Sequence, residues 1–343
     1  MHKVLLFSTR RPEEVETYWD PYQYLQRAFK SGSYEFCSLT DSPEAADLII
    51  ICPSVSFKNP VFPREIFRSS ILLKYSEKCV VFGVNDEATI VHKGFYTSLS
   101  ATKNRSNLLS GGVYLHTVYA PPHEAYSLNI EFKYLFSFLG NFSNHAIRTE
   151  LGSLVKAFSS SLSTMGVRLG FLLQDTSRFQ TELELNSETE KDYKNTYLDS
   201  IRESKFILCP RGGCPSSVRV FETMKAGRVP VIISDEWVPP PEIPWKSFAV
   251  FVKECDVRRI PEILKYEETS FVERALAARK AWDDFLAAEV LPITISRWGM
   301  SLIETSRNSR NGGHLWELSK QSFTWRFIRR GLLSELHGLL KSR

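Results

Sequence analysis

The sequence predicts an α/β protein built from two Rossmann-like domains with parallel sheets. Short, almost wholly apolar runs such as residues 48–52 and 79–84 have the composition of buried parallel strands. Stretches of helical length separate these runs, which is typical of βαβ units. The same alternation restarts after the proline pair at residues 121–122, which indicates a connector between the two halves.

In the first half we expect strands over residues 4–7, 48–52 and 79–84, and an aromatic-rich helix over residues 18–29. Residues 94–116 are rich in Ser, Thr, Asn and Gly, so they predict irregular structure or a short hairpin. These elements define a first domain over residues 1–125.

In the second half the same reasoning predicts a domain over residues 126–320. The expected strands are residues 134–139, 167–173, 205–209, 229–234 and 248–252. The expected helices are residues 147–158 and 190–203, and everything after Pro261 is expected to be helical. Residues 321–343 predict a separate basic helix with an apolar face that carries Trp325, Ile328, Leu332, Leu336 and Leu339. Such a helix can pack across the domains, which we favour, or lie on an anionic membrane surface.

Composition narrows the class of protein. The chain has 343 residues, 43% of them hydrophobic and 24% charged, as in soluble globular proteins. A net charge of +4 does not indicate nucleic acid as the main partner. The six cysteines form no CxxC pair, which disfavours a disulfide framework or a zinc module. The N-terminal apolar run is too short for a signal peptide, so we expect a cytoplasmic protein. Because of the basic tail, peripheral contact with the inner face of the membrane is an alternative.

The most informative segment runs from residue 205 to residue 234. An apolar run leads into a turn with paired glycines, Gly212 and Gly213, then a short helix and a second apolar run. A glycine turn that enters a helix beginning at Ser216-Ser217 directs N–H groups and a helix dipole at one point, which suits a phosphate. On that helix Arg219 can neutralise a phosphate, and Glu222 can accept hydrogen bonds from ribose hydroxyls.

Simpler interpretations of the same residues remain open at this stage. Arg219 and Glu222, three apart on a helix, can form an exposed salt bridge. Ser216 and Ser217 can be helix caps and nothing more. His145 and Arg148 begin another predicted helix, where they can face the same anion or be a loop histidine and a surface arginine.

The sequence does not favour a metal site. It has no DxD pair, and we interpret the nearest imitation, Glu254-Cys255-Asp256, as a loop that enters a helix. In an enzyme that releases a diphosphate without a metal, the negative charge of that diphosphate must be stabilised by arginine side chains and helix dipoles. A GxSxG elbow is also missing, so a hydrolase triad has no support.

Residues 204–252 resemble the exostosin family of glycosyltransferases, the family 47 type. The resemblance is carried by Ser204-Lys205-Phe206, Cys209-Pro210-Arg211-Gly212, Ser217-Val218-Arg219-Val220-Phe221-Glu222, Ala226-Gly227-Arg228-Val229-Pro230-Val231-Ile232 and Trp245-Lys246-Ser247-Phe248. Leu135–Gly140 and Arg148 resemble the start of the family's donor half, so the likeness covers about residues 130 to 265.

The resemblance implies the GT-B fold, with two Rossmann-like domains facing a cleft, and an inverting, metal-independent sugar transfer without a cofactor. The donor is a nucleotide sugar, UDP-linked by family habit, and the acceptor is a polysaccharide or glycolipid. In this sequence Glu222 would hold the ribose. Arg148, Arg211 with Gly212, Arg219 and the helix start at Ser216 and Ser217 would hold the diphosphate.

An inverting transfer also needs a base that deprotonates the acceptor hydroxyl. Asp86 is our candidate, because it follows the expected strand at residues 79–84, and its simpler role is to cap the next helix. The alternatives to this function are a GDP-fucose-type transferase on the same scaffold and a non-catalytic sugar-binding or scaffold protein.

Overall fold

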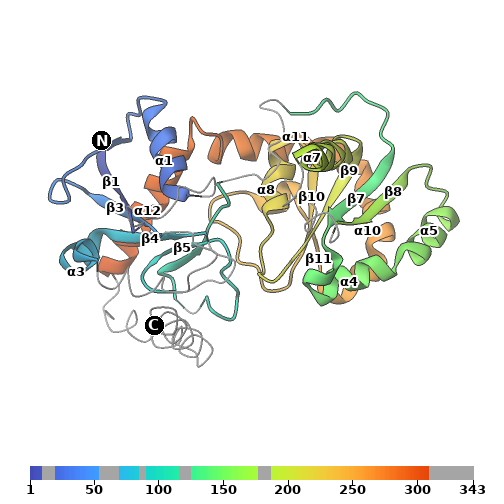
Figure 1. The fold of residues 1–343 in the computed structure, drawn as a ribbon, viewed down its shortest axis with the longest axis horizontal. Coiled ribbons are helices and arrows are strands. Elements are labelled where there is room, and N and C mark those ends of the chain that lie inside the picture. Colours follow the sequence, from blue (N-terminus) through green and yellow to red (C-terminus); the bar gives the residue numbers. More distant parts are fainter. Residues whose placement is uncertain are drawn as a thin grey trace, which may run out of the picture. The chain divides into compact units, whose positions relative to one another are not determined.

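The computed structural model describes residues 1–9, 20–53, 69–84, 90–104, 106–115, 125–176 and 187–308 (Figure 1). Asp86 and the tail at residues 321–343 therefore lie outside the described residues. The chain divides into two compact units. The first contains Met1–His116, Val238–Pro241 and the described residues from Ala288 on; the second contains Thr117–Trp237 and Glu242–Ala287.

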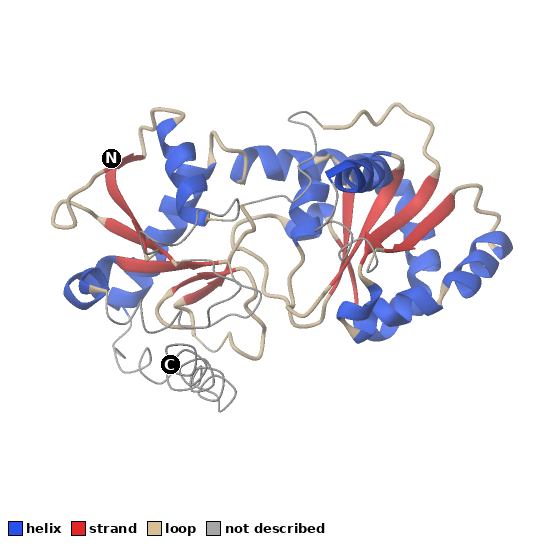
Figure 2. Cartoon of the chain, viewed as in Figure 1, coloured by secondary structure: helices blue, strands red, loops and turns tan. Residues whose placement is uncertain are grey.

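The first unit contains a six-stranded parallel sheet in the order β2-β1-β3-β4-β5-β6. Figure 2 draws the strands in red. Its strands are β1 (His2–Ser8), β2 (Cys37–Leu39), β3 (Leu48–Cys52), β4 (Cys79–Gly83), β5 (Gly94–Tyr96) and β6 (Leu109–Gly111). The three predicted strands are confirmed. The suggested hairpin over residues 94–116 is wrong, because β5 and β6 pair in parallel and extend the sheet. Strands of three residues are too short to show a periodicity.

The helices of the first unit are α1 (Pro21–Lys30), α3 (Ser70–Tyr75), the 3₁₀ turn η1 (Ser76–Lys78) and α12 (Leu291–Asn308). Helix α12 packs on this sheet: the Trp298 ring lies 6.0 Å from the Phe95 ring. Gly299 lies so close that a Cβ there would come within 2.7 Å of Leu48. The second domain was expected to extend to residue 320, but α12 belongs to the first unit. The apolar face of a helix does not specify which sheet that helix covers.

The second unit contains a five-stranded parallel sheet in the order β11-β10-β9-β7-β8. Its strands are β7 (Tyr134–Gly140), β8 (Gly170–Asp175), β9 (Ser204–Pro210), β10 (Val229–Ile233) and β11 (Val250–Val252). The helices are α4 (Ala146–Ser153), α5 (Val155–Thr164), α7 (Ser187–Arg202), α8 (Val218–Lys225), α9 (Trp245–Phe248), α10 (Ile260–Glu267) and α11 (Phe271–Phe285), with 3₁₀ turns η2 (Phe142–Asn144), η3 (Glu254–Arg259) and η4 (Glu268–Ser270).

One predicted helix of this unit is two helices. Residues 147–158 divide into α4 and α5 at Leu154, whose backbone angles are −90° and 3°. The break lets Leu151, Leu154 and Phe158 all enter the same core cluster. Packing against the sheet therefore overrides a local pattern that would support one continuous helix.

Both sheets share one doubly wound strand order. Counted along the chain from β7, the second sheet has the order 2-1-3-4-5, and the first five strands of the first sheet have it too. Ligands of such sheets bind beyond the carboxyl ends of the strands where the winding direction reverses. In the second unit that point lies between β7 and β9, beyond Gly140 and Pro210. The predicted α/β class, with two Rossmann-like domains that each have a parallel sheet, is confirmed.

No helix within the described ranges has the length and apolar character needed to span a bilayer.

Candidate functional site

The turn after β9 and the helix α8 form the centre of the site. The predicted order of strand, glycine turn, helix and strand is confirmed as β9, residues 211–217, α8 and β10. Ser217 occupies the N-cap position of α8, but its side chain makes no capping hydrogen bond. Ser216 is buried as well, at 3% exposure. Helix α8 ends at Ala226-Gly227, where Gly227 takes a left-handed φ of 66°.

Arg219 connects α8 with the end of β7. Its side chain is buried, and its Nη2 donates a hydrogen bond to the Leu139 carbonyl. The guanidinium carbon lies 4.5 Å from the centre of the Phe138 ring and 5.5 Å from that of Tyr197. Burial opposes its charge, but Tyr197, Cys209 and Glu222 around it raise the pKa of Arg219 overall. The group therefore stays cationic.

Arg148 reaches the same place from α4. Its Nε donates to the carbonyl of Arg211 at 2.9 Å, and its Nη2 donates to that of Pro210 at 3.1 Å. Its guanidinium carbon lies 5.5 Å from the Phe138 ring centre. Burial, together with the charge of Arg219, lowers the pKa of Arg148 to about 10. Arg148 thus holds the turn after β9 and brings a second cation to the ring that Arg219 contacts.

These two cations have an unusual environment. Their hydrogen bonds go to carbonyl oxygens, and neither forms an ion pair with a carboxylate in the part of the chain that the structure describes. Several other described arginines form ion pairs with carboxylates. Arg274, for example, lies 2.7 Å from a carboxylate oxygen of Glu267. Two neighbouring guanidinium groups that form no ion pair repel each other, and an anion bound beside them would relieve that repulsion.

Glu222 lies one turn after Arg219 and is 1% exposed. It accepts a hydrogen bond from the hydroxyl of Tyr197, a buried side chain of α7. Burial and the neighbouring Glu222 carboxylate raise the pKa of Tyr197, so the hydroxyl remains a donor. The alternative of an exposed Arg219–Glu222 salt bridge is wrong, because both side chains are buried.

Two glycines let these groups approach each other. A Cβ on Gly140 would lie 2.7 Å from the Phe138 ring and 3.1 Å from Nη2 of Arg219. A Cβ on Gly212 would lie 3.2 Å from Nη2 of Arg148 and from Nδ2 of Asn144. These distances explain why the ends of β7 and β9 carry glycine at these points.

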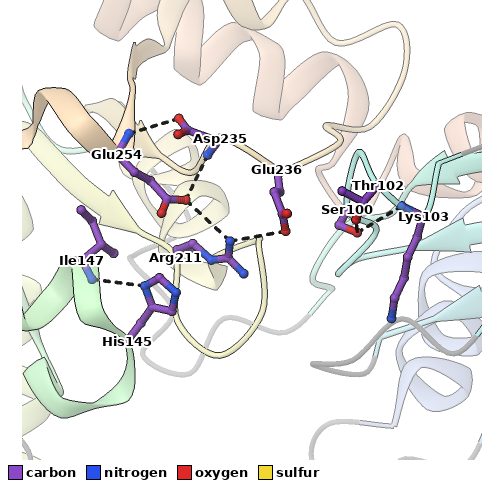
Figure 3. A network of polar contacts seen from close by, with 9 residues as sticks. All are labelled: Ser100, Thr102, Lys103, His145, Ile147, Arg211, Asp235, Glu236 and Glu254. Atoms are coloured by element: carbon purple, nitrogen blue, oxygen red, sulfur yellow. Dashed lines mark hydrogen bonds and ion pairs between the residues drawn. The ribbon is translucent and has the colours of Figure 1, made fainter. Parts of the chain in front are cut away.

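Arg211 lies in a different arrangement from the one expected for a diphosphate ligand. Its Nη1 is 3.5 Å from a carboxylate oxygen of Glu236 and 3.6 Å from one of Glu254 (Figure 3). Glu254 in turn accepts from the N–H of Asp235 at 3.2 Å, and Asp235 accepts from the N–H of Glu254 at 3.1 Å. The charge of Arg211 is thus partly neutralised within the protein, by residues that the sequence analysis did not connect with it.

The remaining predicted groups have structural contacts. His145 is the N-cap of α4, and its Nδ1 accepts from the N–H of Ile147 at 3.2 Å (Figure 3). Burial and the nearby Arg211 lower the pKa of His145, so it is a neutral cap. Glu254-Cys255-Asp256 opens the 3₁₀ turn η3 ahead of α10, as the sequence predicts. Across the described ranges, no group of three His, Cys, Asp or Glu side chains is arranged to hold a metal ion.

Sequence reasoning missed Phe138, Tyr197, Asn144 and Glu236. A signal for Tyr197 existed, because Tyr193 and Tyr197 lie four apart on the predicted helix over residues 190–203 and so share a face. Phe138 and Glu236 offered none, since their partners come from distant parts of the chain.

Comparison with known proteins bears directly on this segment. Residues 115–266 match the family model of the Exostosin GT47 domain. This segment of the chain is therefore similar to an exostosin GT47 domain. The match includes all seven residues expected to bind the donor, and it confirms the family resemblance of residues 130 to 265.

Individual relatives cover less of the chain. It is 40% identical over 88 residues to "Probable glucuronosyltransferase GUT1" of Oryza sativa subsp. japonica, which is 25% of this chain and 21% of that protein. It is 40% identical over 93 residues to "Exostosin-1 homolog" of Caenorhabditis elegans, 26% of this chain and 24% of that protein. The matches therefore span about a fifth to a quarter of these relatives. The crystal structure of TarM aligns with 84% of this chain and 58% of its own, at a TM-score of 0.43 and 10% identity.

Proposed function

We propose that the protein is an inverting, metal-independent glycosyltransferase that moves a sugar from a UDP-sugar to a polysaccharide or glycolipid acceptor. The observation that carries this proposal is the pair Arg148 and Arg219. Both contact Phe138, and neither forms an ion pair with a carboxylate within the described chain. They lie where β7 and β9 end, which is the ligand-binding point of this strand order.

The proposed chemistry follows from these charges. As the acceptor oxygen bonds to the anomeric carbon, the bond from that carbon to the diphosphate breaks, and negative charge grows on the leaving oxygen. Arg148 and Arg219, with the N-terminus of α8, would stabilise that charge in a site with little water. This arrangement requires no cation, and the names of the relatives support sugar transfer as the reaction class.

The other groups have assigned parts in the proposal. Glu222 would accept hydrogen bonds from the ribose hydroxyls of the donor, and Asp86, which lies outside the described residues, would remove the acceptor's proton. Arg211 would contribute less charge than its position suggests, because Glu236 and Glu254 already pair with it.

A screen of nucleotide sugars for protection against thermal unfolding, in buffer with EDTA, tests the proposal. At a ligand concentration about 100-fold above its Kd, binding adds ~2.7 kcal/mol to the free energy of unfolding, an easily measured shift. We expect protection by UDP and one or more UDP-sugars, and loss of it in Arg219→Met. Protection by GDP alone would favour the fucose-type alternative, and protection by no nucleotide would favour a scaffold protein.

A further inference from the structure

Tyr197 is the residue through which α7 contacts the candidate site. Its side chain is 4% exposed, its hydroxyl donates to Oε2 of Glu222, and its ring centre lies 5.5 Å from the guanidinium carbon of Arg219. It thus touches both side chains on α8 to which the proposed function gives a ligand, one through its hydroxyl and the other through its ring.

We propose that Tyr197 is a positioning residue that orients Glu222 toward the ribose and Arg219 toward the diphosphate of the donor nucleotide. This inference rests on the proposed function. It goes further by assigning the two halves of one tyrosine side chain to the recognition of two different parts of the ligand.

The hydroxyl acts on Glu222. A glutamate side chain has three rotatable torsions, and a carboxylate buried to 1% exposure needs hydrogen-bond donors from the protein. A donor on Oε2 fixes the plane of the carboxylate and therefore the direction of its other oxygen. Removing that donor removes one of the contacts that orient the carboxylate, so hydrogen bonds to ribose hydroxyls are made less often.

The ring acts on Arg219. A guanidinium is attracted to an aromatic face, and Arg219 lies near the rings of Phe138 and Tyr197 while its Nη2 donates to the Leu139 carbonyl. Contact with flat rings keeps the planar group from turning. Tyr197→Phe keeps this contact and deletes the hydroxyl, whereas Tyr197→Leu deletes both.

Binding of UDP and of inorganic pyrophosphate to the full chain, measured by calorimetry, separates the two effects. In Tyr197→Phe we expect UDP to bind about 10-fold more weakly, as expected for losing a hydrogen bond to a charged group, and pyrophosphate to bind as before. In Tyr197→Leu both ligands should bind more weakly. The wild-type preference for UDP over its 2′,3′-dideoxy analogue should largely vanish in Tyr197→Phe.

Glu222→Gln and Tyr193→Phe are the matched variants. Glu222→Gln should weaken UDP as much as Tyr197→Phe does, and the double variant should be no weaker than Glu222→Gln, because both changes remove one interaction. Tyr193→Phe deletes a hydroxyl on the same helix that donates to Thr176 Oγ1 at 3.4 Å, so it should leave the preference for ribose unchanged.

The outcomes distinguish the inference from the function on which it rests. If Glu222→Gln weakens UDP and Tyr197→Phe does not, Tyr197 has no positioning role and the inference is overturned. If the wild type binds neither UDP nor pyrophosphate, or binds UDP equally in Glu222→Gln, the proposed function itself fails. If Tyr197→Phe weakens UDP and pyrophosphate alike, the tyrosine supports the fold of the site and not the ribose contact.

Discussion

The two ends of α8 each carry a buried arginine, and their surroundings differ. After the C-terminal end, Arg228 is 0% exposed, and its two terminal nitrogens donate to the carbonyls of Tyr126, Gly227, Ser127 and Arg202 at 2.8–3.2 Å. It contacts the rings of Tyr126 and Phe132. Burial lowers the pKa of Arg228 to about 10. The hydrogen bonds of Arg228 connect three segments of the second unit.

At the N-terminal end, Arg219 is also buried but donates to one carbonyl among the described residues, and a second cation, Arg148, contacts the same Phe138 ring. The difference teaches that burial and lack of a carboxylate do not by themselves mark a ligand site. A single guanidinium whose terminal nitrogens donate to several carbonyls stabilises the fold, whereas two adjacent guanidinium groups with few acceptors favour an anion.

Replacing the structural arginine should have the largest effect. Arg228→Met leaves the carbonyl oxygens it now satisfies without donors, so we expect the free energy of unfolding to fall by ~3 kcal/mol or more, measured by urea denaturation. The control is Arg258→Met, whose side chain is 71% exposed and pairs with Glu150, and which should cost under ~1 kcal/mol. Equal losses in both variants would contradict the structural role.

Replacing the ligand-site arginine should reverse the pattern. Arg219→Met removes repulsion from Arg148 along with one hydrogen bond, so stability should change by under ~1 kcal/mol while UDP affinity falls by ~2 kcal/mol, or about 30-fold. Urea denaturation and calorimetry on the same preparation measure the two quantities. A large loss of stability with unchanged UDP binding would show that Arg219, like Arg228, stabilises the fold and does not bind the ligand.

Glycine at the turn provides a sharper, smaller test. Gly212→Ala places a Cβ 3.2 Å from Nη2 of Arg148, so Arg148 must shift, and we expect UDP to bind about 5-fold more weakly, ~1 kcal/mol. Gly213→Ala is the matched control, because its Cβ would meet only Asn144 Oδ1 at an ordinary 3.7 Å. Similar effects at both glycines would mean that Arg148 does not limit binding.

The smallest expected effect concerns Arg211, the third arginine of the site. Glu236→Gln weakens one of its two ion pairs, at 3.5 Å, so its charge becomes more available to an anion. We expect UDP to bind about twofold more tightly at low salt, with the gain lost at high salt and stability changed by under ~0.5 kcal/mol. Weaker binding of UDP in this variant would show that Glu236 itself contacts the ligand.

Much of this fold could be predicted from local patterns. The apolar runs at β3, β4, β9 and β10 predict buried parallel strands, because each of these strands buries both of its faces. The turn chemistry of Gly227 announces the end of α8 in the same local way. Strands β5 and β6 have three residues each, so they showed no periodicity and were missed.

The sequence could predict which residues belong to the candidate site, but not which side chains contact each other there. Arg148, Arg219 and Glu222 could be named from motif spacing, yet the sequence left a surface salt bridge open, and both α8 side chains are buried. Arg211 matched the same motif, and the structure pairs it with Glu236 and Glu254. Its partners follow β10 and β11, and only the strand order brings those loops beside the turn after β9.

The amino-acid sequence by itself determined the α/β class, the turn and helix at residues 210–228, and the similarity to an exostosin GT47 domain, because these depend on contacts between neighbours in the chain. Tertiary structure alone decided which buried arginine has several carbonyl acceptors and which two arginines share one aromatic ring, and it brought Tyr197 to Glu222. The charge on a guanidinium is the same everywhere; its role depends on the acceptors around it, and for Arg219 and Arg228 most of these come from distant strands, helices and loops.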